Sequence, residues 1–118
     1  MSTDLRVPTP HEMELFRWML VHGKPEAMAF LPQLEGILVS TYCECGCPSL
    51  TLSVRTEHPP VPFAKQIIVE AASERESSCI GLMLWTEGGK LADFEVWEAG
   101  IDERPYELPD TETLRITG

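Results

Sequence analysis

Apolar residues in the first part of the chain recur every three or four positions, which is the spacing of one helix face. Thr9, Pro10 and Glu12 form the pattern of a capping box, in which Thr9 caps the first turn and Glu12 reaches back. Further along, His22 places a cation near the C-terminal end, and Gly23 permits a left-handed cap. We expect a helix from residue 10 to about residue 22, with an apolar stripe formed by Met13, Phe16 and Leu20.

A second, shorter helix is expected over residues 25–31, because Pro25 suits a first helical turn. Its inward positions at helical spacing are Met28, Leu31 and Leu34. Pro32 follows directly, and it must bend or restart the helix there.

From Gly36 onward the apolar period changes to two and β-branched residues become frequent, which indicates strands. The pattern predicts five strands, over residues 37–43, 49–56, 65–72, 78–86 and 90–98. No connection holds a crossover helix, so we expect an antiparallel meander. A short strand or helical turn is expected around residues 113–116.

Together these elements predict a single α+β domain over residues 1–118. Two N-terminal helices pack on one face of an antiparallel sheet of about five strands. An acidic C-terminal tail begins at about residue 99.

The turn Glu87-Gly88-Gly89-Lys90 sets the register of the last hairpin, because both glycines accept the positive φ of a two-residue primed turn. It predicts three apolar pairs on one face: Trp85 with Ala92, Met83 with Phe94, and Gly81 with Val96. In the first hairpin, a four-residue loop over 45–48 predicts Cys43 with Leu50, Thr41 with Leu52, and Val39 with Val54. We expect the helices to cover both of these faces.

The opposite face of the last hairpin carries apolar side chains next to acidic ones. Its apolar members are Ile80, Leu82, Leu84, Leu91 and Trp97, and its acidic members are Asp93 and Glu95. An apolar second face needs cover, and few helical residues remain to provide it. Two alternatives stay open: a homodimer or partner binds there, or the C-terminal tail or a strong twist of the sheet closes it.

Charge and composition narrow the classes of partner. The 118 residues carry 19 acidic and 9 basic side chains, a formal charge of -10, so nucleic acid and anionic membranes would be repelled. The longest apolar stretch, residues 79–85, is too short to span a bilayer, and the first residues lack an apolar leader. We expect a cytoplasmic protein with reduced cysteines that binds neither nucleic acid nor membranes.

Cys43, Cys45 and Cys47 alternate along a turn, and three interpretations of them stay open. With Cys79 or His58 they could bind zinc or copper(I), although structural zinc sites usually use C-x2-C rather than C-x-C spacing. Cys45 and Cys47 could form a strained redox disulfide, although the neighbouring glutamate disfavours the thiolate. In the third interpretation all four thiols are structural.

The start of this turn, Cys43-Glu44-Cys45-Gly46, is similar to the opening of the SEC-C zinc motif. The later ligand pair of that motif is missing, so its zinc site is not carried over. More broadly, residues 36–118 resemble small bacterial domains of unknown function. In those domains a C-x-C-G-C-P-S turn joins two strands and a later hairpin leads to an L-P-D-x-E-T-L tail, here residues 108–114. The resemblance implies no activity.

The sequence contains no pattern of a common active site. A G-x-S-x-G elbow, a phosphate loop and a dinucleotide fingerprint are all missing. His11, His22 and His58 each suit a structural role at a helix end or in a loop. Asp93 and Glu95 share a strand face, which is more often a solvated surface than a catalytic pair. We therefore expect no enzyme activity.

Acidic residues are concentrated between positions 93 and 112, where eight carboxylates and one arginine give -7 of the total charge of -10. Such a region attracts basic partners, as in an immunity protein that covers a basic nuclease, or it serves solubility. We expect a non-enzymatic protein-interaction module, immunity-like or homo-oligomeric, with a thiol-based metal-binding or redox protein as the alternative. The residues expected at its interface are Leu82, Leu84, Asp93, Glu95, Trp97 and Glu98.

Overall fold

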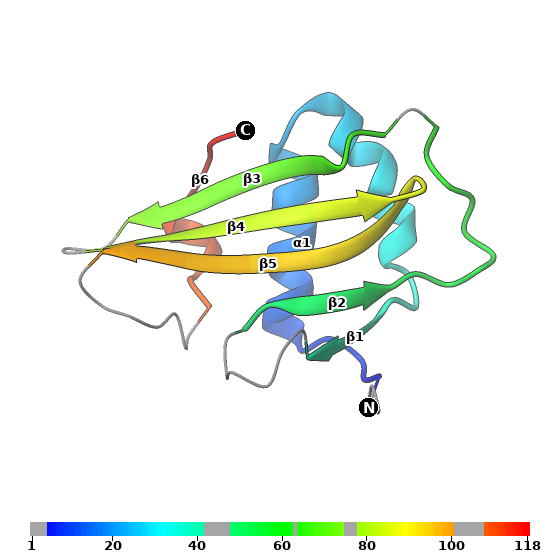
Figure 1. Ribbon diagram of the computed structural model, residues 1–118, viewed down its shortest axis with the longest axis horizontal. Coiled ribbons are helices and arrows are strands. Elements are labelled where there is room, and N and C mark those ends of the chain that lie inside the picture. Colours follow the sequence, from blue (N-terminus) through cyan, green and yellow to red (C-terminus); the bar gives the residue numbers. More distant parts are fainter. Residues whose placement is uncertain (1–4, 42–47, 63, 75–77, 101–107) are drawn as a thin grey trace.

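One antiparallel sheet is covered on one face by helical segments, so the expected α+β fold is confirmed (Figure 1). The computed structural model describes residues 5–41, 48–62, 64–74, 78–100 and 108–118. The helical segments are α1 (Pro10–His22) and the 3-10 helices η1 (Pro25–Leu34) and η2 (Thr111–Thr113). The strands are β1 (Leu38–Thr41), β2 (Leu50–Ser53), β3 (Ile67–Glu74), β4 (Ser78–Glu87), β5 (Lys90–Gly100) and β6 (Leu114–Ile116).

The sheet has six strands in the order β1-β2-β5-β4-β3-β6, which differs from the expected five-stranded meander. Strand β2 pairs with β5 rather than with β3, because the connection after β2 carries the chain to the far side of the β4–β5 hairpin (Figure 1). The sixth strand comes from the short element expected around 113–116, and it pairs with β3.

Helix α1 begins as the capping box predicts. The Thr9 hydroxyl accepts a hydrogen bond from the Glu12 N–H at 3.1 Å, and the Glu12 carboxylate accepts one from the Thr9 N–H at 2.9 Å. The buried side of the helix then packs on the sheet, with the rings of Phe16 and Phe94 edge to face at a centroid distance of 5.0 Å. The other fully buried residues of α1 are Leu15, Met19 and Leu20.

Gly23 ends α1 for a different reason from the one expected. Its φ of -76° is not left-handed, so the expected left-handed cap is wrong. A Cβ at this position would lie 2.9 Å from Cγ2 of Val69 and 3.0 Å from the carbonyl oxygen of Met19. The glycine therefore permits the close approach of the helix end to β3.

The second helical segment is a 3-10 helix of 10 residues, and this changes which side chains face inward. A 3-10 helix has three residues per turn, so Ala27, Phe30 and Gln33 share the buried side. The expectation that Met28 faces inward is wrong, because its side chain is 48% exposed. Leu34 is buried as expected, and Leu31 packs against the core while partly exposed.

Gln33 fastens η1 to the tip of the β4–β5 hairpin. Its side-chain amide donates to the carbonyl of Gly89 at 3.0 Å, and its side-chain oxygen accepts from the N–H of Leu91 at 2.9 Å. The same amide lies 3.4 Å from the carbonyl of Pro59 in the connection between β2 and β3. This buried side chain fixes the hairpin relative to the helical layer.

The β4–β5 hairpin starts in the expected register but changes it at a β-bulge. Next to the turn, Thr86 pairs with Leu91 as expected, whereas Trp85 pairs with Asp93 rather than with Ala92. A one-residue shift moves every later side chain to the other face of a strand. The predicted faces of β4 are therefore exchanged, so the helices cover Ile80, Leu82 and Leu84. Phe94 and Val96 of β5 face the helices as expected.

The β1–β2 hairpin also differs in register, by two residues. Thr41 pairs with Leu50 and Val39 with Leu52, whereas the expected partners were Leu52 and Val54. Because the shift is even, Val39, Leu50 and Leu52 still face the core as expected. Among the described residues, no helix has both the length and the apolar character needed to cross a membrane.

Candidate protein-interaction face

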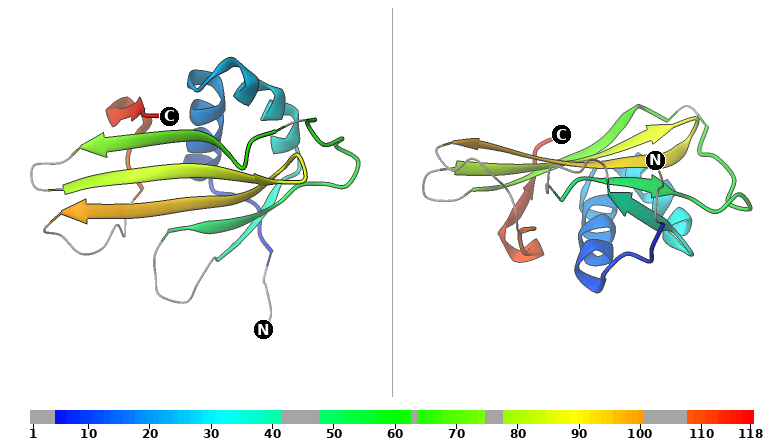
Figure 2. Two further views of the ribbon diagram at one scale, coloured as in Figure 1. Left: turned by 45° about the horizontal axis from the view of Figure 1, so that its top comes forward. Right: turned by 60° about the horizontal axis from the view of Figure 1, so that its bottom comes forward.

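The face of the sheet opposite the helices is the candidate site, and it is called the open face below. In Figure 2 (right), α1, η1 and η2 all lie on one side of the sheet. Strand alternation places six residues of the central hairpin on the other side. These are Gly81, Met83 and Trp85 of β4, and Asp93, Glu95 and Trp97 of β5.

Trp97 is the most exposed large side chain of this face, at 40%. It pairs with Gly81, and a methyl group at Gly81 would overlap Cε2, Cζ2 and Nε1 of the indole. The indole therefore lies directly against the backbone of β4. A ring supported in this way offers an apolar contact surface with little conformational freedom to lose on binding.

Trp85 is linked to Glu95 across the hairpin. Its indole N–H donates to the Glu95 carboxylate at 3.0 Å, diagonally across the Met83–Glu95 pair. This hydrogen bond orients the carboxylate on the open face. The pair thus combines a partly buried indole with an anionic group of fixed position.

The pKa of Asp93 is raised by partial burial first, and then by the negative charges of Glu87 and Glu95. Within the described parts of the chain, no Lys, Arg or His forms an ion pair with Asp93 or Glu95. Asp93 and Glu95 therefore repel each other when ionised, with no ion-pair partner among the described residues.

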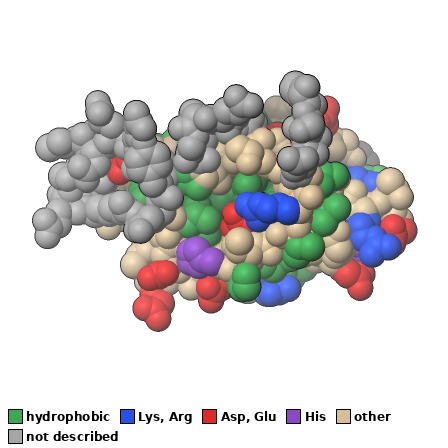
Figure 3. All heavy atoms as spheres, turned by 90° about the horizontal axis from the view of Figure 1, so that it is seen from below, with side chains coloured by type: hydrophobic (Ala, Val, Ile, Leu, Met, Phe, Trp, Pro, Cys, Tyr) green, Lys and Arg blue, Asp and Glu red, His purple; other side chains and the backbone are tan. Residues whose placement is uncertain are grey.

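Further carboxylates extend the negative charge of the open face. By register, Glu70 and Glu74 of β3 and Glu87 of β4 lie on the same side as Asp93 and Glu95. Two basic residues also lie there: Lys90 opposite Glu87, and Arg115 of β6, which pairs with Glu74 at 2.6 Å. Figure 3 shows the molecule from below the view of Figure 1, and on the described surface of that side basic side chains lie among acidic ones.

Three of the six expected interface residues lie together on the open face, and three do not. Leu82 and Leu84 are 0% exposed in the core beneath the helices, so they cannot contact a partner of the folded chain. Glu98 pairs with Ile80 on that same helix side. Both of its carboxylate oxygens are buried, with no hydrogen-bond partner within the part of the chain that the structure describes. The bulge-shifted register corrects Leu82 and Leu84, whereas alternation along β5 places Glu98 on the side opposite Trp97.

Met83 and Trp85 belong to the open face, although the register predicted from the sequence placed them under the helices. One signal in the sequence could have identified them. The apolar positions Leu91 and Phe94 are three apart, which interrupts strict alternation and is typical of a β-bulge. Placing both Leu91 and Phe94 on the buried side requires one extra residue between them, which shifts the register by one residue.

The cysteine hypothesis rests on residues that the structure describes only in part. Cys43, Cys45 and Cys47 lie outside the described residues. Cys79 has a free, partly buried thiol in β4. His58, the other suggested ligand, has its Nε2 at 2.9 Å from the carbonyl oxygen of Glu35. No group of three or more potential metal ligands occurs among the described residues.

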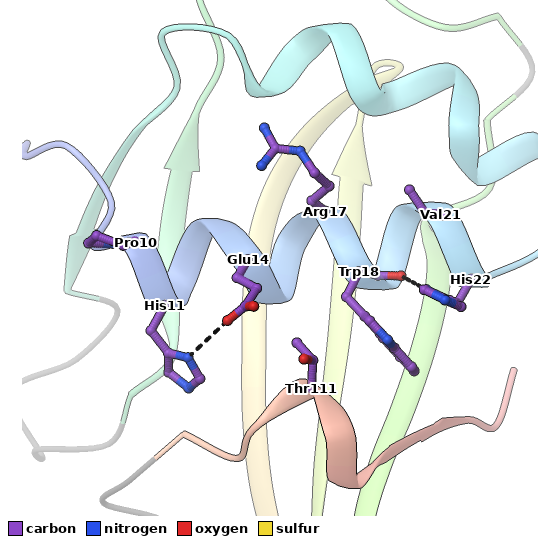
Figure 4. A pocket seen from close by; sticks show the side chains of 8 residues that line it. All are labelled: Pro10, His11, Glu14, Arg17, Trp18, Val21, His22 and Thr111. Atoms are coloured by element: carbon purple, nitrogen blue, oxygen red, sulfur yellow. Dashed lines mark hydrogen bonds and ion pairs between the residues drawn. The ribbon is translucent and has the colours of Figure 1, made fainter.

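A groove of about 590 Å³ lies on the outer side of α1, away from the open face (Figure 4). Trp18 and His22 stack there with ring centroids 4.5 Å apart, and His22 Nδ1 is 2.9 Å from the Trp18 carbonyl oxygen. His11 lies 3.7 Å from Glu14. The groove is lined by Pro10, His11, Glu14, Arg17, Trp18, Val21, His22 and Thr111. These residues carry charges of both signs and do not favour one class of ligand.

The acidic segment 93–112 does not form one continuous surface in the described structure. Asp93 and Glu95 lie on the open face, whereas Glu98 faces the helix side. Asp110 precedes η2, and Glu112 lies within it. Asp102, Glu103 and Glu107 lie outside the described residues.

No family model, curated protein or solved structure matches this chain. Its function is therefore inferred from the chemistry of its own surface.

Proposed function

We propose that this chain is a non-enzymatic protein-interaction module whose open face binds a basic segment of another protein in the cytoplasm. The observation that carries the proposal is the grouping of Trp85 and Trp97 with Asp93 and Glu95 on the sheet face that no described helix covers. Aromatic side chains are the common anchors of protein interfaces, and unpaired carboxylates select a partner of positive charge.

A basic partner is favoured over a second copy of the chain by the charge of the face. In a symmetric dimer the same patch of both copies would meet, which brings Asp93 and Glu95 against their own counterparts. The pKa of Asp93 is already raised by burial and by neighbouring carboxylates within one copy. A second set of carboxylates would increase this repulsion, whereas a cation would relieve it.

The shape of the open face favours binding over catalysis. Enzyme active sites are generally concave and enclose most of a small substrate. Here the aromatic and acidic side chains come from neighbouring, hydrogen-bonded strands and spread over the surface of a sheet. The carboxylate of Glu95 is engaged by an indole N–H, which orients it for recognition.

Affinity capture with matched variants tests the proposal. Trp97→Ala and Glu95→Gln each alter the open face, and Met28→Ala and Glu26→Gln are controls of similar type at exposed positions of η1. We expect a protein with a basic surface to be retained by the unmodified chain and by both controls. Its retention should fall about tenfold or more with either open-face variant.

Sedimentation velocity of the purified chain separates the two kinds of partner. A monomer that forms a one-to-one complex with the captured protein would agree with the proposal. Equal capture by all four variants would contradict it. So would a stable homodimer that Trp97→Ala dissociates, because the open face would then bind a second copy.

A further inference from the structure

We infer that the open face recognises an arginine side chain, with its guanidinium held by the carboxylate of Glu95 and stacked against Trp97, and with the charge of Asp93 adding to the attraction. This inference rests on the proposed function and names the chemistry that the partner presents. It follows from the arrangement of four side chains on two neighbouring strands: Trp85, Asp93, Glu95 and Trp97.

The two carboxylates provide the charge and the hydrogen-bond acceptors. Asp93 and Glu95 are two residues apart on β5, which places their backbone positions about 7 Å apart on the same side of the strand. One oxygen of Glu95 accepts from Trp85, and the other accepts no hydrogen bond from any described residue. A cation at Glu95 would therefore meet an acceptor oxygen that no described residue uses, and Asp93 adds a second negative charge nearby on the same strand.

The indole of Trp97 provides a flat surface on the same face as Glu95, two positions further along β5. Its ring is supported by the backbone at Gly81. With 40% of Trp97 exposed, part of its ring remains available to a partner. A cation over an indole is attracted by the negative potential of the ring face.

Arginine fits this combination better than lysine does. Its guanidinium is planar, so it can stack on an indole and still direct N–H donors sideways to carboxylates. It is also less strongly hydrated than an ammonium group, which lowers the cost of removing it from water. A metal ion fits less well, because the indole N–H of Trp85 directs a donor towards the carboxylate of Glu95.

Paired peptides test this inference directly. The probes are two short acetylated peptides that differ only in carrying arginine or lysine at alternate positions between glycine and serine residues. Isothermal titration calorimetry against the full chain gives both dissociation constants. We expect the arginine peptide to bind roughly fivefold more tightly than the lysine peptide.

Variants assign the preference to the proposed groups. Glu95→Gln should lower the affinity for the arginine peptide about tenfold, and the control Glu26→Gln should leave this affinity unchanged. Trp97→Leu should remove the preference for arginine, and Trp97→Phe should retain part of it. Circular dichroism of each variant verifies that the fold is intact before the affinities are compared.

The outcomes separate this inference from the proposed function. Equal binding of both peptides, or a preference that Trp97→Leu does not change, would contradict arginine recognition, and capture of a basic protein through the open face could still succeed. Failure of both peptides to bind would also contradict arginine recognition. Failure of the peptides and of the protein capture together would contradict both.

Discussion

The indole of Trp97 occupies the space that a side chain at Gly81 would fill. These two residues face each other on neighbouring strands, in the only pair of the β4–β5 ladder that joins a glycine of β4 to a tryptophan of β5. The missing side chain at Gly81 lets the ring rest on the backbone while its outer part remains exposed. Gly81 therefore determines where the most exposed aromatic group of the open face lies.

Replacing Gly81 with alanine is expected to displace the Trp97 indole and weaken binding of a basic partner about tenfold. The free energy of unfolding should change by less than about 1 kcal/mol, since Trp97 can turn towards solvent. Calorimetry and urea unfolding measure the two effects. In a Trp97→Ala background, Gly81→Ala should have no further effect on binding, and an equal loss in both backgrounds would contradict this account.

Asp93→Asn is expected to stabilise the fold and to weaken the binding of a basic partner. Burial and the charges of Glu87 and Glu95 raise the pKa of Asp93 above 3.8, so the folded chain binds this proton more tightly than the unfolded chain. Stability is therefore lost as pH rises from 3.8 through the folded-state pKa. At pH 7 the variant should gain up to about 1 kcal/mol.

Urea unfolding of Asp93→Asn across a pH series tests the sign of this effect. The difference between variant and unmodified chain should disappear at pH values below 3.8, where Asp93 is protonated in both states. A variant that is less stable at pH 7, or one that binds the arginine peptide as tightly as the unmodified chain, would contradict the assignment.

Glu12 is expected to make the fold sensitive to acid. Burial alone would raise its pKa, but hydrogen bonds from Arg6 and Thr9 and the charge of Arg6 outweigh it and lower the pKa below 4.5. Both Arg6 terminal nitrogens lie 2.9 Å from the carboxylate. The contribution of Glu12 is thus present above pH 4.5 and is lost as pH falls through the lowered pKa.

At pH 7, Glu12→Gln should reduce the free energy of unfolding by about 1–2 kcal/mol. The unmodified chain and the variant should converge as pH falls below 4.5, which denaturant unfolding at several pH values measures. Glu26→Gln, at an exposed position of η1, serves as the control and should have no such effect. A constant difference at all pH values would argue against a role of the Glu12 charge.

Gln33→Leu is expected to destabilise the fold by about 2–4 kcal/mol, because the N–H of Leu91 and the carbonyl of Gly89 would lose their buried partner. Gln66→Leu is the matched control, since Gln66 is exposed directly before β3. Thermal unfolding of both variants makes the comparison. Equal melting temperatures would show that the hairpin tip does not depend on Gln33.

The parts of the fold that local chemistry determines could be predicted from the sequence. The Thr9 to Glu12 pattern located the start of α1, and the glycines after Glu87 located the β4–β5 turn. The pairing of β2 with β5 could not be predicted in the same way. It depends on a connection, residues 54–66, whose path is determined by contacts with η1 and the hairpin tip rather than by its own sequence pattern.

The candidate site was predicted only in part, because its faces depend on one residue of register. Asp93, Glu95 and Trp97 were correctly placed on one face, since alternation along a single strand needs no partner. Which side chains of β4 join them depends on the bulge between Trp85 and Thr86, so Leu82 and Leu84 were assigned in place of Met83 and Trp85. Met28 was wrongly assigned to the core because the prediction used α-helical spacing, whereas η1 is a 3-10 helix with three residues per turn.

The most direct test of the open face uses the three tryptophans of the chain as reporters in a ¹H–¹⁵N correlation spectrum. Trp85 and Trp97 lie on the open face, whereas Trp18 lies on α1 in the outer groove. Single Trp→Phe variants assign the three indole N–H signals before the arginine peptide is added. We predict that the signals of Trp85 and Trp97 shift and that of Trp18 does not; a shift confined to Trp18 would contradict the account.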